Sequence, residues 1–174
     1  MVMLVSGFAV SQSNVPPKVV SVPAFTVIGI ECRTDNAKEA SGHGCIGKQW
    51  GRLFGEGFVD KIPGKLDRSI IAVYTDYASD KDGEYTYILG AKVKDDTTAP
   101  ADMVKVKVAA GKYAVFTSEK GAAQQVVPAT WKRIWETPKS QPGGNRTYKT
   151  DFELYDQRAT DPKNSEVDIY IGVR

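Results

Sequence analysis

The sequence repeats itself at a spacing of about 81 residues, and this repeat restricts the fold more than any other feature. A tryptophan motif occurs twice, as Trp50-x-x-Leu53-Phe54 and as Trp131-x-x-Ile134-Trp135, so that Trp50 and Trp131 are 81 positions apart (131 − 50). Tyr74 and Tyr155 have the same separation (155 − 74), and the segments 87–90 and 169–172 align at 82 positions (172 − 90). Similarity at one fixed spacing is typical of a duplicated structural unit, although unrelated helices can match a short motif by chance.

The first copy has the pattern strand, helix, strand, strand. Residues 19–31 favour one long strand, in which Pro23 and Gly29 indicate a bulge or a sheet edge. A polar loop over residues 33–41 follows. Apolar residues then recur at i, i+4, i+7 and i+8 from Ile46, which predicts an amphipathic helix. Residues 70–77 and 84–93 favour two strands joined by a turn that contains Asp-Gly.

The second copy repeats this order. Residues 103–108 and 113–116 flank Gly111 as one kinked strand, Pro128 can begin a helix that Pro138 stops, and residues 151–155 and 166–173 alternate as two strands. We therefore predict an α+β fold of two pseudo-symmetric βαββ repeats that form an antiparallel sheet with two main helices. The repeats span about 19–93 and about 103–174 of a single domain over residues 1–174, and residues 1–17 are expected to be a loose leader.

Composition excludes several classes of protein. With 23 basic and 21 acidic residues the net charge is +2, so we expect no direct DNA binding. The apolar start lacks the basic region of a signal peptide, and no stretch approaches the roughly 20 apolar residues of a membrane span, so we expect a soluble cytoplasmic protein. Because small secreted scaffolds carry several disulfides, we interpret the two cysteines, Cys32 and Cys45, as reduced thiols.

Motifs for cofactors and metals are weak in this chain. Gly42-His43-Gly44-Cys45-Ile46-Gly47 matches G-x-G-x-x-G, but the dinucleotide fingerprint requires a strand immediately before it, and here a polar loop precedes it. His43 is the single histidine, and zinc needs three or four ligands. We therefore expect no cofactor and no metal.

The last two predicted strands carry polar residues in alternation with apolar ones. Phe152 and Leu154 share one face of their strand, and Glu153 and Tyr155 share the other. In the final strand Tyr170 lies opposite the face of Ile169. If the apolar faces meet the helices, Glu153, Tyr155 and Tyr170 project together from the other side of the sheet. A solvated strand face is the simpler alternative.

Five segments of the sequence occur in a characteristic order, and they are residues 71–77, 111–116, 131–135, 151–156 and 167–173. Together they closely resemble GyrI-like small-molecule-binding domains, and most of all the stand-alone, integron-associated effector-binding proteins. The resemblance implies a tandem βαββ fold with an aromatic ligand cleft between the repeats, in which a strand glutamate meets cationic or polar amphiphiles. Glu153 matches that glutamate, and Tyr170 resembles the tyrosine of the family's last strand.

We therefore expect a free-standing protein that binds amphiphilic, cationic small molecules, or the effector half of an assembly with a regulatory or DNA-binding partner chain. A hydrolase of reactive small molecules, with Glu153 as general base and Tyr170 beside it, is the alternative, and an inhibitor of a protein such as a topoisomerase is a third. The oligomeric state stays open, as does which of Trp131 and Trp135 lines the cleft. The candidate ligand-binding residues are Glu153, Tyr170, Trp131, Trp135, Tyr155, Tyr74, Trp50 and Phe54.

Overall fold

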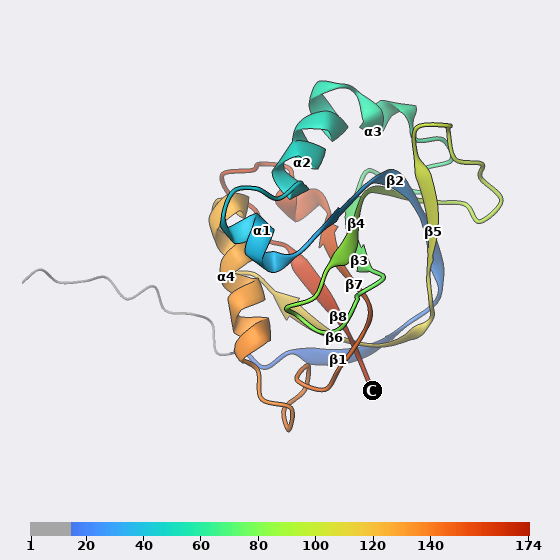
Figure 1. The fold of residues 1–174 in the computed structure, drawn as a ribbon. Helices are drawn as coiled ribbons and strands as arrows, with labels where there is room; N and C mark the ends of the chain where they lie inside the picture. The colour runs from blue at the N-terminus through green and yellow to red at the C-terminus, as the bar shows by residue number, and fades with distance from the viewer. Residues whose placement is uncertain (1–14) are drawn as a thin grey trace, which may run out of the picture.

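The computed structural model describes residues 15–174, within which eight strands form one antiparallel sheet (Figure 1). Most of the leader predicted over residues 1–17 lies outside the described residues. The strands are β1 Lys18–Val22, β2 Phe25–Thr34, β3 Ile70–Thr75, β4 Tyr85–Val93, β5 Val104–Val108, β6 Gly111–Thr117, β7 Arg146–Tyr155 and β8 Asp168–Val173. The helices are α1 Asn36–Ala40, α2 Ile46–Gly55, α3 Phe58–Lys61 and α4 Ala123–Glu136, with a short 3-10 helix at Gln157–Ala159.

The strand order is symmetric about the centre of the sheet. It runs β1-β6-β8-β7-β3-β4-β2-β5, so that each strand of one half has a counterpart at the same distance from the β7/β3 junction. At that junction Ala72 lies opposite Glu153, and these residues are 81 positions apart (153 − 72), which is the spacing of the sequence repeat. A local two-fold axis therefore passes between Ala72 and Glu153. The predicted α+β fold of two pseudo-symmetric repeats is confirmed.

The first strand of each repeat is wrong in the prediction, because each is two strands that separate. β1 pairs with β6 of the second half, whereas β2 pairs with β4 and β5. Likewise β5 pairs with β2, and β6 pairs with β8. The two halves thus exchange their short first strands. Pro23, between β1 and β2, has no N–H to donate to a sheet ladder and breaks the run there.

The alignment of the last strands is also wrong. Ala72 lies opposite Leu89, and Glu153 lies opposite Ile169, so the structurally equivalent residues of β4 and β8 are 80 positions apart (169 − 89) rather than 82. The alternation of apolar residues is preserved by a shift of two, which is why the sequence alone allowed both registers.

The helices follow the predicted pattern with two corrections. α2 begins at Ile46 as predicted, and α4 ends before Pro138, but α4 begins at Ala123 and contains Pro128 in its second turn. Proline there removes one intrahelical hydrogen bond, which a helix with a buried face tolerates. The predicted loop over residues 33–41 contains α1, whose first turn is capped by the Asp35 side chain, which accepts a hydrogen bond from the Lys38 N–H at 2.7 Å.

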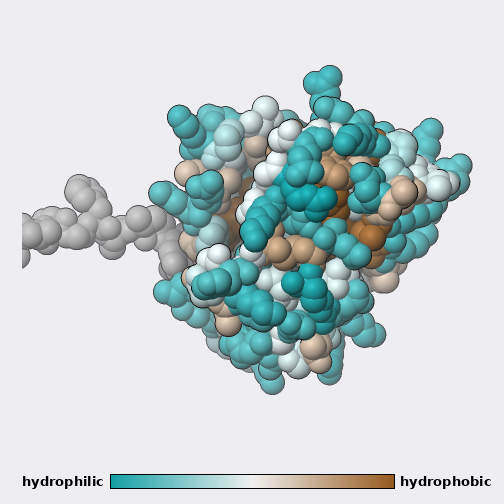
Figure 2. Space-filling model, turned by 45° about the horizontal axis from the view of Figure 1, so that its top comes forward, coloured by the Kyte–Doolittle hydropathy of each residue, from teal (hydrophilic) through white to brown (hydrophobic). Residues whose placement is uncertain are grey.

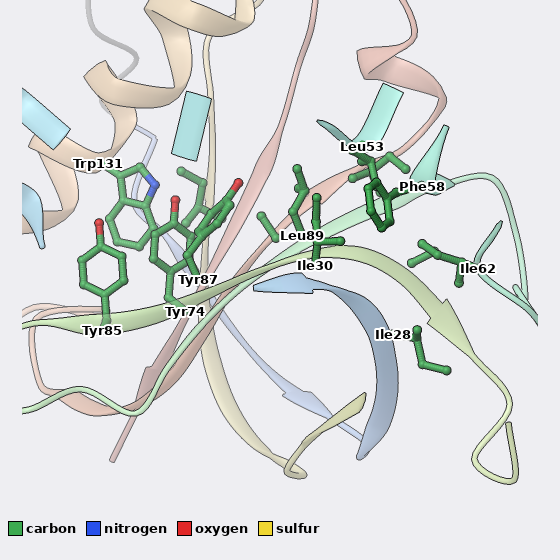
Figure 3. Close-up of a cluster of buried hydrophobic side chains, with 14 of the residues drawn as sticks. Ile28, Ile30, Leu53, Phe58, Ile62, Tyr74, Tyr85, Tyr87, Leu89 and Trp131 are labelled. Carbon is green, nitrogen blue, oxygen red and sulfur yellow. The ribbon is translucent and has the colours of Figure 1, made fainter. Parts of the chain in front are cut away.

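Both faces of the sheet are buried. On one face α2, α3 and α4 contribute Leu53, Phe58, Trp131 and Ile134 to a core with the strand side chains (Figure 3). On the other face the sheet curls on itself: the rings of Phe25 in β2 and Phe152 in β7 are 5.1 Å apart, although two strands separate them in the sheet. The surface drawn in Figure 2 shows apolar areas between hydrophilic side chains. No helix among the described residues is long and apolar enough to cross a membrane.

The interpretation of the cysteines as reduced thiols is wrong. Cys32 of β2 and Cys45, the residue before α2, form a disulfide, with their Cα atoms 6.5 Å apart. The Glu39 carboxylate holds the same junction, because it accepts hydrogen bonds from the Thr34 hydroxyl at 2.6 Å and from the Cys45 N–H at 2.8 Å. A count of cysteines could not show that β2 and α2 bring the pair together.

We predict that reduction of this disulfide lowers stability while the fold persists. The bonded cysteines are 13 positions apart, and closing a loop of about this size contributes roughly 3 kcal/mol in the chain-entropy account. Thermal unfolding with and without dithiothreitol measures the change. The double variant Cys32→Ser/Cys45→Ser is the control, since its melting temperature should not respond to the reductant. An equal melting temperature of the wild-type protein under both conditions would show that the bond adds no stability.

Candidate functional site

A buried carboxylate lies at the centre of the helix-covered face. Glu153 of β7 is 1% exposed, and its two oxygens accept three hydrogen bonds. Oε1 accepts from the Tyr74 hydroxyl at 2.8 Å and from the Trp131 indole N–H at 2.6 Å. Oε2 accepts from the Tyr155 hydroxyl at 2.7 Å. β3, β7 and α4 thus converge on one charge, and Figure 3 shows Tyr74 and Trp131 close together on this side of the sheet.

Six aromatic side chains form two series of ring contacts that begin at the residues bound to this carboxylate, and we call them the aromatic frame. Its inner members are Tyr74 and Trp131, which are buried, with Tyr155 and Trp50, which are half-buried. Its outer members are Phe54, which is 57% exposed, and Trp135, which is 40% exposed. The structure therefore brings Glu153 and the aromatic frame into one site. The tryptophans of α4 differ, since Trp131 binds the carboxylate and Trp135 lies at the rim.

The ring contacts of the aromatic frame are related by the local two-fold axis. The Trp50 and Tyr155 rings are 4.8 Å apart, and the equivalent rings of Trp131 and Tyr74 are 4.9 Å apart. Trp50 lies 6.1 Å from Phe54, and Trp131 lies 6.2 Å from Trp135. The same ring contacts therefore occur on both sides of the axis, and in each of them a tryptophan of one repeat meets a tyrosine of the other.

Tyr170 does not belong to this site, contrary to the prediction. It lies opposite Phe152 in the β7–β8 ladder, and the two rings stack at 4.4 Å in the core on the other face of the sheet. The prediction assumed that the apolar Phe152 faces the helices, whereas both faces of this sheet are buried and the helix side takes Glu153. A catalytic pair of Glu153 and Tyr170 is therefore not assembled.

The electrostatics favour a carboxylate surrounded by neutral donors. Burial raises the pKa of Glu153 above its ordinary value, and the hydrogen bonds from Trp131, Tyr155 and Tyr74 oppose that rise. Burial and then the charge of Glu153 raise the pKa of both tyrosines well above their usual range, so their hydroxyls stay protonated and donate. Within residues 15–174, no Lys, Arg or His forms an ion pair with Glu153.

Two features near the site do not follow from the predicted elements. The first is a pair of tyrosines, Tyr85 and Tyr87 of β4, which lie beside Tyr74 with ring distances of 5.3 and 5.2 Å; their i, i+2 spacing in a predicted strand was the available signal. The Tyr87 hydroxyl is buried without a hydrogen-bond partner. Burial, and then the charge of Glu153, raise the pKa of Tyr87 well above its usual range, and the nearby Trp50 indole opposes that rise.

The second feature is a buried ion pair. Arg146 and Asp151 of β7 meet at 2.7 Å, and the Tyr77 hydroxyl donates to the same Asp151 oxygen at 2.6 Å. The Arg146 guanidinium also lies 4.4 Å from the Tyr148 ring centre and 5.8 Å from that of Trp131. No sequence pattern indicated this pair, because its partners meet only through an irregularity in the β7–β8 ladder.

Neither the glycine motif nor the histidine forms a site among the described residues. Gly42 to Gly47 connects α1 to α2 rather than following a strand, so it lacks the context of a dinucleotide fingerprint. No group of three His, Cys, Asp or Glu side chains in the described part of the chain could hold a metal ion. His43 is exposed and lies 3.2 Å from the Ser41 hydroxyl.

This chain is similar to a described protein family and to proteins of known structure. The family described as integron-associated effector binding protein matches residues 18–173. YobU of Bacillus subtilis (strain 168) is 34% identical over 147 residues, which cover 84% of this chain and 90% of YobU. The crystal structure of an integron cassette protein from Vibrio cholerae is similar with a TM-score of 0.70 and 30% identity, covering 91% of this chain and 96% of that protein.

A third similar structure is that of SAV2435 bound to tetraphenylphosphonium, with a TM-score of 0.67 and 20% identity, covering 92% of this chain and 94% of that protein. At this identity the likeness concerns the fold. The family match spans nearly all of the described residues, in agreement with the GyrI-like resemblance of the sequence. The chain therefore belongs to the family of integron-associated effector binding proteins.

Proposed function

We propose that this protein binds amphiphilic small molecules that carry one positive charge, with Glu153 as the counter-charge and the aromatic frame as the wall. The observation behind this proposal is a carboxylate that is 1% exposed and held by neutral donors. Burying a charge without an opposite charge costs several kcal/mol, so a cationic ligand would supply what the chain itself lacks. The tetraphenylphosphonium bound to SAV2435 supports this ligand class.

The rings explain how such a site tolerates chemical variety. A cation beside an aromatic face gains roughly 0.5–2 kcal/mol, and flat rings also supply apolar contact area. The site imposes one charge and an apolar body rather than a pattern of directed hydrogen bonds, which is the condition for broad selectivity. Because Glu153 is almost completely covered, a ligand reaches it only when rings of the aromatic frame move apart.

We further propose that this binding serves a regulatory partner chain and that the protein itself does not bind DNA.

Intrinsic fluorescence offers a direct test. All three tryptophans of the chain, Trp50, Trp131 and Trp135, belong to the aromatic frame, so ligand binding should change their emission. Tetraphenylphosphonium should give a saturable change, whereas the anion tetraphenylborate, which has the same shape, should not. Equal responses to both ions would contradict a carboxylate as the selective element, and absence of a response to the cation, checked by calorimetry, would reject the proposed function.

The affinity for tetraphenylphosphonium is expected to fall as the pH is lowered. Burial raises the pKa of Glu153 in the free protein, and a bound cation lowers it again, because an opposite charge favours the ionised form. The affinity for tetraphenylphosphonium is therefore full above the free-protein pKa and falls as the pH drops through it, by up to about tenfold per pH unit. Titrations over a pH series measure this, and Glu153→Gln is the control, since its profile should be flat. A rise in wild-type affinity on acidification would contradict the assignment.

A further inference from the structure

The aromatic frame has two-fold symmetry, but the charge within it has none. Tyr74 donates to one oxygen of Glu153 and Tyr155 donates to the other, so one hydroxyl from each half meets the same carboxylate. The residue related to Glu153 by the local axis is Ala72, which is directly opposite it in the β3–β7 ladder and completely buried. The site therefore places a single negative charge close to the axis between two equivalent sets of rings.

The two halves of the frame lead outward from that charge. In one half Tyr155 contacts Trp50, which stacks on the exposed Phe54, and in the other half Tyr74 contacts Trp131, which lies beside the exposed Trp135. A ligand with its charge at one end would engage the rings of one half only. A ligand with its charge in the middle would engage both.

We propose that the site selects monocations whose charge lies at the centre of the molecule, between two aryl arms. We also propose that residue 72, which carries no charge and which we call the vacant position, can hold the counter-charge in place of residue 153. This inference rests on the proposed function and specifies the shape of its ligand. It follows from the symmetry of the ring contacts and from the place of Glu153 beside the axis.

Two isomeric cations test the shape. Dibenzyldimethylammonium carries its nitrogen between two benzyl arms, whereas (biphenyl-4-ylmethyl)trimethylammonium has the same atoms and charge but carries its nitrogen at one end. The first should bind about tenfold more tightly in calorimetric titration, because it keeps the contacts of a second ring system. Equal affinities, or tighter binding of the second isomer, would overturn the proposed shape. They would leave the proposed function intact, since both are cations.

Moving the carboxylate across the axis tests the vacant position. A glutamate at residue 72 would stand two residues before Tyr74, as Glu153 stands two residues before Tyr155, and it would have Trp50 in the place of Trp131. Glu153→Ala should lose affinity for dibenzyldimethylammonium. The double variant Ala72→Glu/Glu153→Ala should recover it to within about tenfold of wild type, a tolerance that allows for one imperfect hydrogen bond.

The matched control is Ala72→Gln/Glu153→Ala, which has the same size and no charge and should not recover affinity. Circular dichroism and thermal unfolding establish that each variant is folded. A folded charge-moved variant that binds no better than this control would overturn the vacant position. If the charge-moved variant does not fold, residue 72 cannot hold the carboxylate and that part of the proposal fails, while the pair of isomers still decides the ligand shape.

Discussion

Replacing Glu153 with glutamine is expected to lower the affinity for tetraphenylphosphonium by about tenfold to a hundredfold while the protein stays folded. Glutamine keeps the size of the side chain and an oxygen that can accept from Trp131 and Tyr74, and its NH2 group can donate to the Tyr155 hydroxyl, but it removes the charge. A charge-assisted contact in a buried site contributes roughly 1.5–3 kcal/mol, which corresponds to that loss. Fluorescence titration gives the affinity, and thermal unfolding gives the stability.

Tyr170→Phe is the control for this prediction. Tyr170 is a ligand residue in the sequence-based prediction, but it lies on the other face of the sheet and stacks on Phe152, so loss of its hydroxyl should leave the affinity unchanged. Equal affinity of Glu153→Gln and the wild type would reject Glu153 as the counter-charge. A large fall in melting temperature for Glu153→Gln would instead assign the carboxylate to the stability of the fold.

The internal repeat makes most of the candidate site predictable from the sequence. A spacing of 81 residues links Trp50 to Trp131 and Tyr74 to Tyr155, and the fold places these residues in equivalent contacts about one axis. Glu153 is indicated by the family resemblance rather than by the repeat, because its counterpart is alanine. The strand pattern alone allows a solvated carboxylate as readily as a buried one.

The errors of sheet face and strand pairing have a common physical cause. Alternation in a strand shows which residues share a face, but it does not show which face the helices cover or which sheet neighbour a strand takes. The pattern therefore assigns Tyr170 to the face of Glu153, and β1 and β5 to their own repeats, which is wrong in each case. The disulfide between Cys32 and Cys45 escapes prediction for another reason, because a count of cysteines does not show that β2 and the start of α2 lie side by side.

Replacing Arg146 with methionine is expected to destabilise the protein by about 3–5 kcal/mol, because removing one partner of a buried ion pair leaves an uncompensated charge in the interior. Arg146 and Asp151 are both buried and meet at 2.7 Å. Asp151 would keep only the Tyr77 hydroxyl, at 2.6 Å, and the Gly172 N–H, at 2.8 Å. Methionine retains much of the volume that packs against the neighbouring rings, so the effect reports the charge more than a cavity. Chemical denaturation measures the free energy of unfolding.

The double variant Arg146→Met/Asp151→Asn separates the charge from the packing. Asparagine keeps an oxygen that can accept from the Gly172 N–H and removes the buried charge, so the double variant should be less destabilised than Arg146→Met alone. A single variant as stable as the wild type would show that the pair contributes little. A double variant that is less stable than the single one would show that the loss comes from broken hydrogen bonds at the ladder irregularity. Glu153 stands two residues beyond Asp151 on β7. In either case the ion pair would not help to hold this strand in place, and the ladders to β3 and β8 alone would fix the position of Glu153.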